Sequence, residues 1–397
     1  MKLARRVSAI APSKTFGVDS MVSEMRKKGI DVVSFGIGEP DFDTPDYVKE
    51  AGIDAINRGY TKYTQASGSP ELKEAICEKL KRDNNLDYQP SQVIVSCGAK
   101  HAIYNIMQAM CEDGDEIIIP SPYWLSYPEQ VRLNGGIPVF VKADFGQGFK
   151  VSPEALASAI TKRTKLMIIN SPCNPSGVVY TRSELEAIAE VALKHGVYVI
   201  SDEIYEDFVY DGIEHVSIAS LGDEIKEITL VVNGVSKGFA MTGWRIGYVA
   251  GDQEIIKAMA NIQSHTTSNP VSISQKAAIA ALRGPKDWTR QMVSEFKARR
   301  DLVAEGLRDI PGIEFNLPRG AFYMFPRVSS LYGRRLGGVQ VKDSASFCEA
   351  LLAEARVALV PGSAFGDDEC VRLSYATSTE KVKEGMRRLK EALLNMQ

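Results

Sequence analysis

The stretch Val231-Val232-Asn233-Gly234-Val235-Ser236-Lys237-Gly238 is the starting point for interpreting this chain. The apolar run from Ile228 to Val232 predicts a buried strand, and Asn233-Gly234 is a pair that ends strands. The lysine that follows stands among small residues, where partial burial would lower the pKa of its amine. A neutral amine can attack an aldehyde to form a Schiff base, whereas an ammonium cannot. The alternative is a solvated lysine in a surface turn, and motifs elsewhere in the chain decide between the two.

The composition is that of an ordinary globular protein. The chain has 397 residues, of which 44% are hydrophobic and 24% charged, and its formal net charge is −3. This length exceeds what one hydrophobic core usually supports, so we expect two domains. The small net charge gives no reason to expect nucleic acid or an anionic membrane as a partner. Because the sequence shows neither a signal-peptide pattern nor a run of about 18 apolar residues, we expect a cytoplasmic protein.

The cysteines and histidines indicate neither a disulfide framework nor a metal site. The six cysteines are scattered and form no CxxC pair, as expected for reduced thiols in the cytoplasm. The four histidines show no metal-ligand spacing. Cys97 and Cys173 lie beside candidate site residues, and the sequence leaves open whether they do more than fill space.

Short apolar segments alternate with helical patterns through the first two thirds of the chain. Helix starts are indicated at Ser69-Pro70-Glu71, Ser152-Pro153-Glu154 and the capping box Thr181-Arg182-Ser183-Glu184. Seven segments predict strands: Val93–Ser96, Glu116–Ile119, Ile137–Val141, Lys165–Ile169, Val197–Ser201, Thr229–Val232 and Ile246–Ala250. Strands that are apolar on both sides predict an α/β fold with a mostly parallel seven-stranded sheet covered by helices. Ligands of such sheets bind at the carboxyl ends of the strands.

The pattern changes after Gly284-Pro285. A long charged helix at about Trp288 to Arg308, a helix near Ser344 to Ala355, and strands at Val357 to Val360 and Cys370 to Ser374 predict a smaller α+β domain. We therefore expect an N-terminal arm that joins the small domain (residues 1–45), a large cofactor-binding domain (46–288) and a C-terminal small domain (289–397).

The arm contains one segment of possible functional interest. Pro12-Ser13-Lys14-Thr15 predicts a turn, Ser20 to Lys28 a short helix, and Val32 to Phe35 a short strand. The following segment, residues 36–45, is dense in glycine and proline but lacks the third glycine of a dinucleotide-binding motif. Gly38 instead suits a backbone that passes close to a ligand.

Polar residues follow three of the predicted strands. Gly98-Ala99-Lys100 leads into an amphipathic helix whose N-terminus could receive a phosphate. Asn174 lies in an irregular loop, and Asp202 ends an apolar strand, where an acid needs a cation or a donor. Tyr205 would face the same side as Asp202. Taken singly, each has a structural alternative: a plain turn, a turn asparagine, a capping aspartate or a core tyrosine.

Taken together, these residues match the needs of pyridoxal 5'-phosphate. That cofactor requires a Schiff-base lysine, an acid that keeps its pyridine nitrogen protonated, donors to its phenolic oxygen and a phosphate cup. The candidates for these roles are, in turn, Lys237, Asp202, Tyr205 with Asn174, and Gly98-Ala99-Lys100 with Arg245.

Over essentially its whole length the chain resembles a fold-type I, class I/II aminotransferase. The motifs that carry the resemblance are Asn174-Pro175-Ser176-Gly177, Asp202-Glu203-Ile204-Tyr205, Ser236-Lys237 followed by Gly243-Trp244-Arg245, and Arg372-Leu373-Ser374. The chain is most similar to the bacterial aspartate aminotransferase branch that also contains prephenate aminotransferases. One departure is Gly234, where related enzymes often carry a hydroxyl residue that binds phosphate.

The resemblance implies a role for each matched residue. Lys237 would form the Schiff base and shuttle the proton, with Ser236 beside it at the cofactor, and Trp124 would stack on the cofactor ring. Arg372 would clamp the substrate α-carboxylate, helped by Asn174 and the backbone of Gly38. Tyr63 would reach the cofactor phosphate of a neighbouring subunit, which implies a homodimer with shared active sites.

The implied reaction is a ping-pong transamination between L-aspartate, or another acidic amino acid, and 2-oxoglutarate. In this branch a lysine at the place of Lys100 is associated with the distal carboxylate of the substrate, and residues 12–15 match a segment that closes over it. Prephenate is an alternative amino acceptor. A β-eliminating lyase on the same scaffold remains an alternative, and a non-enzymatic sensor is disfavoured because every catalytic position is filled.

Overall fold

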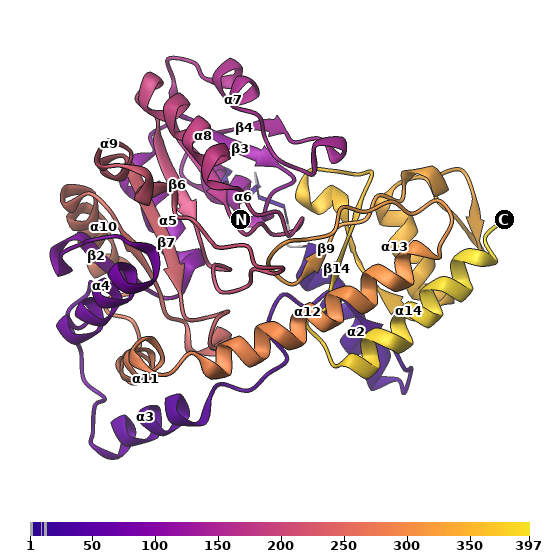
Figure 1. Ribbon diagram of the computed structural model, residues 1–397, viewed down its shortest axis with the longest axis horizontal. Helices are drawn as coiled ribbons and strands as arrows, with labels where there is room; N and C mark the ends of the chain where they lie inside the picture. The colour runs from indigo at the N-terminus through magenta and orange to yellow at the C-terminus, as the bar shows by residue number, and fades with distance from the viewer. Residues whose placement is uncertain (1–2, 9, 12–13) are drawn as a thin grey trace.

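A seven-stranded sheet forms the centre of the larger half of the protein (Figure 1). The computed structural model describes residues 3–8, 10–11 and 14–397. The strand order is β2-β8-β7-β6-β5-β3-β4, and β8 alone runs antiparallel to its neighbours in this sheet. The strands are β2 (Val93–Ser96), β3 (Glu116–Ser121), β4 (Ile137–Lys142), β5 (Thr164–Asn170), β6 (Tyr198–Asp202), β7 (Thr229–Gly234) and β8 (Gly247–Ala250). The predicted mostly parallel seven-stranded sheet is confirmed.

Helices cover both faces of this sheet because alternate strand residues point to opposite sides. Ile94, Ile168 and Val232 belong to the core on one face, and Val95, Met167 and Val231 to the cores on the other. One face packs against α5 (Ala99–Met110), α6 (Ser126–Leu133) and α10 (Gln253–Thr266). The other packs against α4 (Pro70–Asn84), α7 (Pro153–Ala159), α8 (Arg182–His195) and α11 (Ser272–Arg283). The carboxyl ends of β2, β3, β5, β6 and β7 therefore meet at one edge of the sheet.

The predicted helix starts are formed by side-chain caps. The Ser69 hydroxyl accepts a hydrogen bond from the Leu72 N–H, and Ser152 does the same for Ala155. Thr181 and Glu184 form the predicted capping box at the start of α8. Each cap satisfies backbone donors that the first turn of a helix leaves unpaired.

The smaller half is built around α12 (Asp287–Arg308), which runs from the sheet half toward the C-terminal elements (Figure 1). It also contains α13 (Ser344–Glu354), α14 (Thr379–Leu394) and an antiparallel sheet of β13 (Val360–Pro361), β14 (Val371–Ser374) and β9 (Tyr323–Met324). Strand β1 (Val33–Ser34) of the N-terminal arm pairs with β12 (Val357–Ala358). Strands β10 (Arg335–Leu336) and β11 (Val339–Gln340) pair with each other. Elsewhere in the protein, the helices α1 (Arg5–Ser8), α3 (Asp46–Asn57) and α9 (Asp223–Glu227) lie among the described residues.

Two local predictions were wrong. Helix α2 (Lys14–Lys27) begins six residues before the predicted Ser20 and includes Lys14 and Thr15, which were predicted as a turn. Pro12 and Ser13 lie outside the described residues. The predicted single strand Val357–Val360 is divided between β12 and β13, which pair with strands of two different sheets. In both cases tertiary contacts override the local pattern. Val18 and Val22 of α2 pack against Ala358 of β12. Strand β12 pairs with β1, whereas β13 pairs with β14.

None of the helices among the described residues combines the length and the apolar character that crossing a bilayer requires.

Candidate active site

A cavity of about 560 Å³ opens at the carboxyl edge of the sheet, where the two halves of the protein meet. Its lining comes from the ends of β5 and β6, the turn after β7, the start of α5 and the small half. Most of the predicted site residues line it: Gly38, Ala99, Lys100, Trp124, Asn174, Asp202, Tyr205, Ser236, Lys237, Arg245 and Arg372. The cavity therefore gathers residues that lie as far apart in sequence as Gly38 and Arg372.

Lys237 stands in the turn that follows β7, and its amine faces the cavity. Its Nζ donates a hydrogen bond of 2.6 Å to the carbonyl oxygen of Gly38. Burial lowers the pKa of this amine to about 8, with Glu39 opposing the shift and Arg245 and Arg372 adding to it. The amine is thus much closer to its neutral, nucleophilic form at physiological pH than an ordinary lysine is.

The lowered pKa of Lys237 predicts how the stability of the cofactor-free protein depends on pH. The folded-state pKa, about 8, lies below the ordinary value of 10.5, so between these values the unfolded chain holds a proton that the folded chain lacks. The free energy of unfolding should therefore rise with pH, by about 2 kcal/mol between pH 8 and about 9.5. Denaturant unfolding of the wild type and of Lys237→Met at these pH values measures the effect. If the free energy of unfolding changed with pH in the same way in both proteins, the lowered pKa of Lys237 would be contradicted.

Asp202 is fully enclosed at the end of β6. Its Oδ2 accepts a hydrogen bond of 2.5 Å from the hydroxyl of Tyr127, and its Oδ1 accepts one from the Ile204 N–H at 3.3 Å. Burial raises the pKa of Asp202 to about 6, while these hydrogen bonds and Lys237 oppose the rise. The carboxylate is therefore ionised at neutral pH and ready to hold a cationic group in the cavity.

Tyr127 was missed in the sequence interpretation. It is buried in α6, whereas Trp124 lies just before that helix, and the two aromatic rings meet edge to face with their centroids 5.3 Å apart. The nearness of Tyr127 to Trp124 in the sequence was the signal that could have placed both at the cavity.

Tyr205 is joined to a second residue that the sequence interpretation missed. Its hydroxyl lies 2.7 Å from the hydroxyl of Tyr323, on β9 of the small half. Burial raises the pKa of both phenols, so both keep their protons. When Tyr323 donates to Tyr205, the Tyr205 proton is left to be donated into the cavity.

Arg372, on β14, is a buried cation aimed at the cavity. Its guanidinium donates to Asn174 Oδ1 at 3.1 Å and to the carbonyl oxygen of Gly36 at 2.6 Å, and it lies over the ring of Tyr323. The carbonyl that contacts Arg372 is thus Gly36, whereas the Gly38 carbonyl faces Lys237. Burial lowers the pKa of Arg372, and its Nε has no partner among the described residues. A carboxylate ligand would supply the missing acceptor.

The N-terminus of α5 forms a cradle for an anion. Gly98 precedes the helix with φ 86°, a left-handed conformation that favours glycine. A Cβ atom at Gly98 would lie 2.4 Å from the Arg245 guanidinium, so the absence of a side chain lets this cation approach the helix start. No side chain caps α5 within the described part of the chain. The first-turn N–H groups and Arg245 together suit a phosphate.

The glycine at position 234 has a steric explanation. A Cβ there would lie 2.8 Å from the carbonyl oxygen of Ile246 and 2.9 Å from the Cα of Gly247. A hydroxyl side chain therefore does not fit at Gly234 in this backbone, and Ser236, which lines the cavity, is the nearby hydroxyl.

Of two further predicted residues, Lys100 lies at the cavity and Tyr63 lies away from it. The Lys100 ammonium lies over the Trp124 ring, 5.0 Å from its centroid, at the wall of the cavity. Tyr63 does not line the cavity, and the residue is 90% exposed. Among the predicted site residues, Tyr63 is the one that this chain by itself does not bring to the site.

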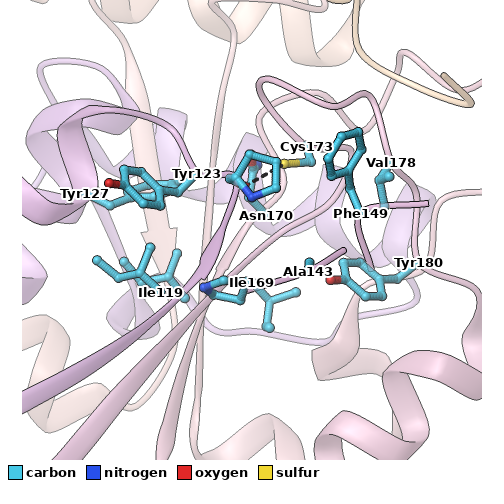
Figure 2. A pocket seen from close by; sticks show the side chains of 13 residues that line it. Ile119, Tyr123, Tyr127, Ala143, Phe149, Ile169, Asn170, Cys173, Val178 and Tyr180 are labelled. Atoms are coloured by element: carbon cyan, nitrogen blue, oxygen red, sulfur yellow. Dashed lines mark hydrogen bonds between the residues drawn. The ribbon is translucent and has the colours of Figure 1, made fainter. Parts of the chain in front are cut away.

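A second, much smaller cavity adjoins the site, and Tyr127 and Asn170 line both (Figure 2). Its volume is about 20 Å³, enough for one water molecule rather than a substrate. Cys173 borders it, and its thiol donates a weak hydrogen bond to the carbonyl oxygen of Pro122. Burial raises the pKa of both Cys173 and Cys97, so neither is an activated thiolate, and we interpret both as packing residues.

The fold and the cavity define an α/β enzyme with a nucleophilic lysine, a buried acid, an anion cradle and a carboxylate-binding arginine. Residues 30–389 match the family model of aminotransferase class I and II. The chain belongs to this family, whose members use pyridoxal 5'-phosphate, and it is an aminotransferase.

Individual relatives match over the full length. The chain is 51% identical to the aspartate aminotransferase of Bacillus subtilis (strain 168), with 98% of each chain covered. It is 49% identical, at the same coverage, to the probable aspartate/prephenate aminotransferase of Aquifex aeolicus (strain VF5). The crystal structure of the aspartate aminotransferase from Rhizobium meliloti superimposes with a TM-score of 0.97 at 45% identity and covers 100% of both chains.

The residues of the cavity fit pyridoxal 5'-phosphate. The cradle of Gly98 and Arg245 suits its phosphate, Asp202 suits its ring nitrogen, and Lys237 suits its aldehyde. The unpartnered Nε of Arg372 leaves a separate place for the carboxylate of an amino acid. The cavity therefore has complementary groups for both the cofactor and a substrate.

Proposed function

We propose that the enzyme transfers the amino group of L-aspartate, or of another acidic amino acid, to 2-oxoglutarate. The observation that carries this proposal is the pair of cations at the cavity, Arg372 and Lys100, in addition to Lys237 and the anion cradle. Two separate cations match the two carboxylates of a dicarboxylic substrate. The two relatives from Bacillus subtilis and Rhizobium meliloti carry the name aspartate aminotransferase, which agrees with this choice.

The protein residues have distinct roles in the proposed reaction. When bound, the cofactor withdraws electrons from the substrate Cα and so makes its proton acidic. Asp202 holds a proton at the pyridine nitrogen, and Tyr205 donates a hydrogen bond to the phenolic oxygen, assisted by Asn174. Trp124 packs against the cofactor ring, while Gly98, Ala99, Lys100, Ser236 and Arg245 surround the phosphate.

Lys237 is the group that moves a proton. In its neutral form, the Lys237 amine would accept the proton of the substrate Cα, because burial lowers its pKa to about 8. Arg372 fixes the α-carboxylate so that the Cα–H bond stays within reach of Lys237. The second half-reaction uses the same residues in the reverse direction.

The visible absorption of the purified, cofactor-loaded enzyme tests this function. L-Aspartate should decrease the absorption of the bound cofactor, and 2-oxoglutarate should then restore it. Faster recovery with prephenate would favour the second candidate, a prephenate aminotransferase, which the name of the Aquifex aeolicus relative suggests. Pyruvate and ammonia formed without an amino acceptor would indicate a β-lyase instead. An absorption that aspartate and glutamate leave unchanged would contradict the proposal.

Lys100 should determine the preference for a second carboxylate. Lys100→Met keeps an unbranched side chain over Trp124 but removes the charge, so kcat/KM for L-aspartate should fall by about 10-fold to 100-fold. L-Asparagine, which has the same shape without the charge, should be affected by less than about 3-fold. Steady-state kinetics with both amino acids measures this change in selectivity.

Arg372→Lys is the matched control for Lys100→Met. It weakens the grip on the α-carboxylate, which both amino acids possess, so both kcat/KM values should fall by similar factors. An aspartate-to-asparagine ratio that is unchanged in Lys100→Met would show that Lys100 does not read the distal carboxylate.

The proposal extends to the assembly and location of the protein. We propose a homodimer in which Tyr63 reaches the cofactor phosphate of the partner, since this residue is 90% exposed on a single chain. We also propose the division into an arm (1–45), a large domain (46–288) and a small domain (289–397). A cytoplasmic location agrees with the six free cysteines.

A further inference from the structure

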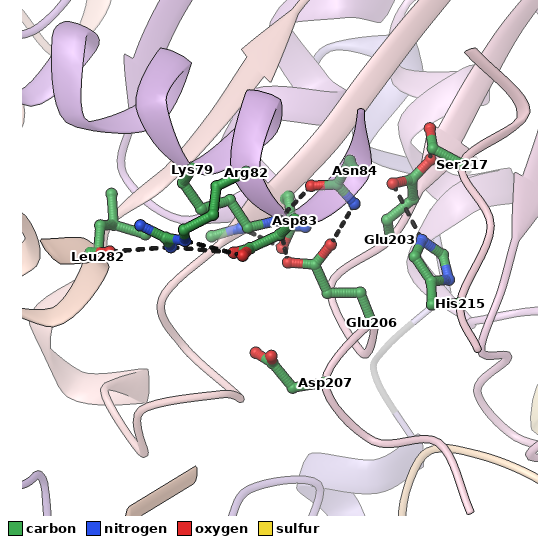
Figure 3. Close-up of polar contacts among 12 residues, drawn as sticks. Lys79, Arg82, Asp83, Asn84, Glu203, Glu206, Asp207, His215, Ser217 and Leu282 are labelled. Carbon is green, nitrogen blue, oxygen red and sulfur yellow. Dashed lines mark hydrogen bonds and ion pairs between the residues drawn. The ribbon is translucent and has the colours of Figure 1, made fainter. Parts of the chain in front are cut away.

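The turn that carries Asp202 and Tyr205 also carries two carboxylates that do not line the cavity. Asp202 and Tyr205 line the cavity, whereas Glu203 and Glu206 make their contacts with α4 and with the loop at residues 215–217. Figure 3 shows these contacts. We call Lys79, Asn84, Glu203, Glu206 and His215 the rear polar cluster.

Glu203 is held at three points. Its Oε1 accepts hydrogen bonds from the hydroxyls of Ser201 at 2.7 Å and Ser217 at 2.6 Å, and its Oε2 lies 3.1 Å from Nε2 of His215. Only 1% of the Glu203 side chain and 8% of the His215 side chain are exposed. Burial lowers the pKa of His215, but the hydrogen bond and charge of Glu203 outweigh it, so the net pKa is raised.

Glu206 connects the same turn to α4. Its Oε1 forms an ion pair with Lys79, and its Oε2 accepts a hydrogen bond of 2.7 Å from the Asn84 amide. Lys79 also donates to Asn84 Oδ1 at 2.6 Å, so the three side chains form a closed set of contacts. The exposed fractions of Lys79 and Glu206 are 5% and 9%. A buried ion pair of this kind fixes geometry, because either charge left alone would be strongly destabilised.

The rear polar cluster does not need a metal ion. One carboxylate oxygen each of Glu203 and Glu206 and a ring nitrogen of His215 lie within 4.8 Å of one another, which is a spacing that a cation could bridge. The Lys79 ammonium already pairs with Glu206, however, and Nε2 of His215 already contacts Glu203. The charges are therefore balanced by protein groups.

We propose that Glu203 and Glu206 are positioning residues: by anchoring the rear of the 202–206 turn, they hold Asp202 and Tyr205 in register with the cofactor. The backbone supports this role, since the Glu203 N–H bonds the Val232 carbonyl of β7 and the Glu206 N–H bonds the Glu203 carbonyl. Glu203 directly follows Asp202 in the chain, and Glu206 directly follows Tyr205. A shift of either glutamate therefore moves the cavity residue before it. The inference rests on the proposed roles of Asp202 and Tyr205 in cofactor binding.

Glu206→Gln tests the proposal in the cofactor-loaded enzyme. The substitution keeps the size of the side chain but removes the charge that fixes Lys79. We expect the visible circular dichroism of the bound cofactor to change, its dissociation constant to rise about 5-fold, and kcat to fall about 10-fold. The KM for L-aspartate should change by less than about 2-fold, because Arg372 lies on another strand.

Glu116→Gln is the matched control. Glu116 is the first residue of β3, so it lies at the end of the strand that is remote from the cavity. It is also buried, and it accepts hydrogen bonds from Thr161 at 2.6 Å and Arg163 at 2.5 Å. If the role of Glu206 were purely structural, Glu206→Gln and Glu116→Gln would both lose stability and neither would alter the cofactor spectrum. Wild-type circular dichroism, cofactor affinity and kcat in Glu206→Gln would overturn the proposal.

The double variant Lys79→Met with Glu206→Met provides a test that does not depend on the folding of the single variant. It removes both charges, and a packed apolar pair often matches the stability of a buried ion pair. The proposal expects a stable protein that still shows the altered cofactor spectrum and the lowered kcat. Recovery of the wild-type spectrum would overturn it. A wild-type enzyme without cofactor absorption would instead overturn the proposed function, and this inference with it.

Discussion

Lys237→Ala is expected to lower the rate of transamination by about 10⁴-fold or more. Lys237 is the amine whose pKa burial brings to about 8 and whose Nζ faces the cavity beside the Gly38 carbonyl. In its absence the substrate Cα proton would have to be removed by water. The measurement is the single-turnover rate of the absorption change when L-aspartate is added to the cofactor-loaded variant, which separates the chemistry from product release.

Two further variants control this experiment. Lys237→Arg keeps a cation in the turn, but a guanidinium does not give up its proton near neutral pH, so it should be nearly as slow as Lys237→Ala. Lys257→Ala removes a lysine whose side chain is 68% exposed on α10, and its rate should equal that of the wild type. A Lys237→Ala rate within about 10-fold of the wild type would remove Lys237 from the mechanism.

Asp202→Asn is expected to lower kcat by about 10³-fold. Asparagine has the same shape and can still accept the hydrogen bond from Tyr127, which is 2.5 Å long in the wild type. It carries no negative charge, however, and so cannot hold a proton at the pyridine nitrogen of the cofactor. The dissociation constant of the cofactor should rise as well, and both quantities can be measured by absorption titration and steady-state kinetics.

Tyr127→Phe separates charge from hydrogen bonding at this site. It removes the hydrogen bond that the Tyr127 hydroxyl donates to Asp202 but leaves the charged carboxylate, so we expect a loss of only about 10-fold in kcat. Equal losses in Tyr127→Phe and Asp202→Asn would show that the orientation of the side chain, rather than its charge, is what the reaction requires.

Much of the site could be predicted because its residues occupy fixed places relative to local patterns. Lys237 follows a buried strand and a strand-ending pair, and Asp202 ends the apolar run of β6. The carboxyl ends of parallel strands share an edge, so these two residues had to lie near each other once the sheet was recognised. Tyr127 and Tyr323 were missed because their importance lies in their partners, Asp202 and Tyr205, which are 75 and 118 positions away in the chain.

The sequence by itself determined the seven strands, the helix caps and the class of chemistry. Each of these depends on periodicity or on motifs within a few residues, where covalent neighbours set the geometry. Only the tertiary structure decided that the Gly36 carbonyl contacts Arg372, that residues 357–361 divide between two sheets, and that Lys79 anchors Glu206. These contacts join segments far apart in the chain, and their free energy comes from burial and hydrogen bonding that exist only after the elements have packed.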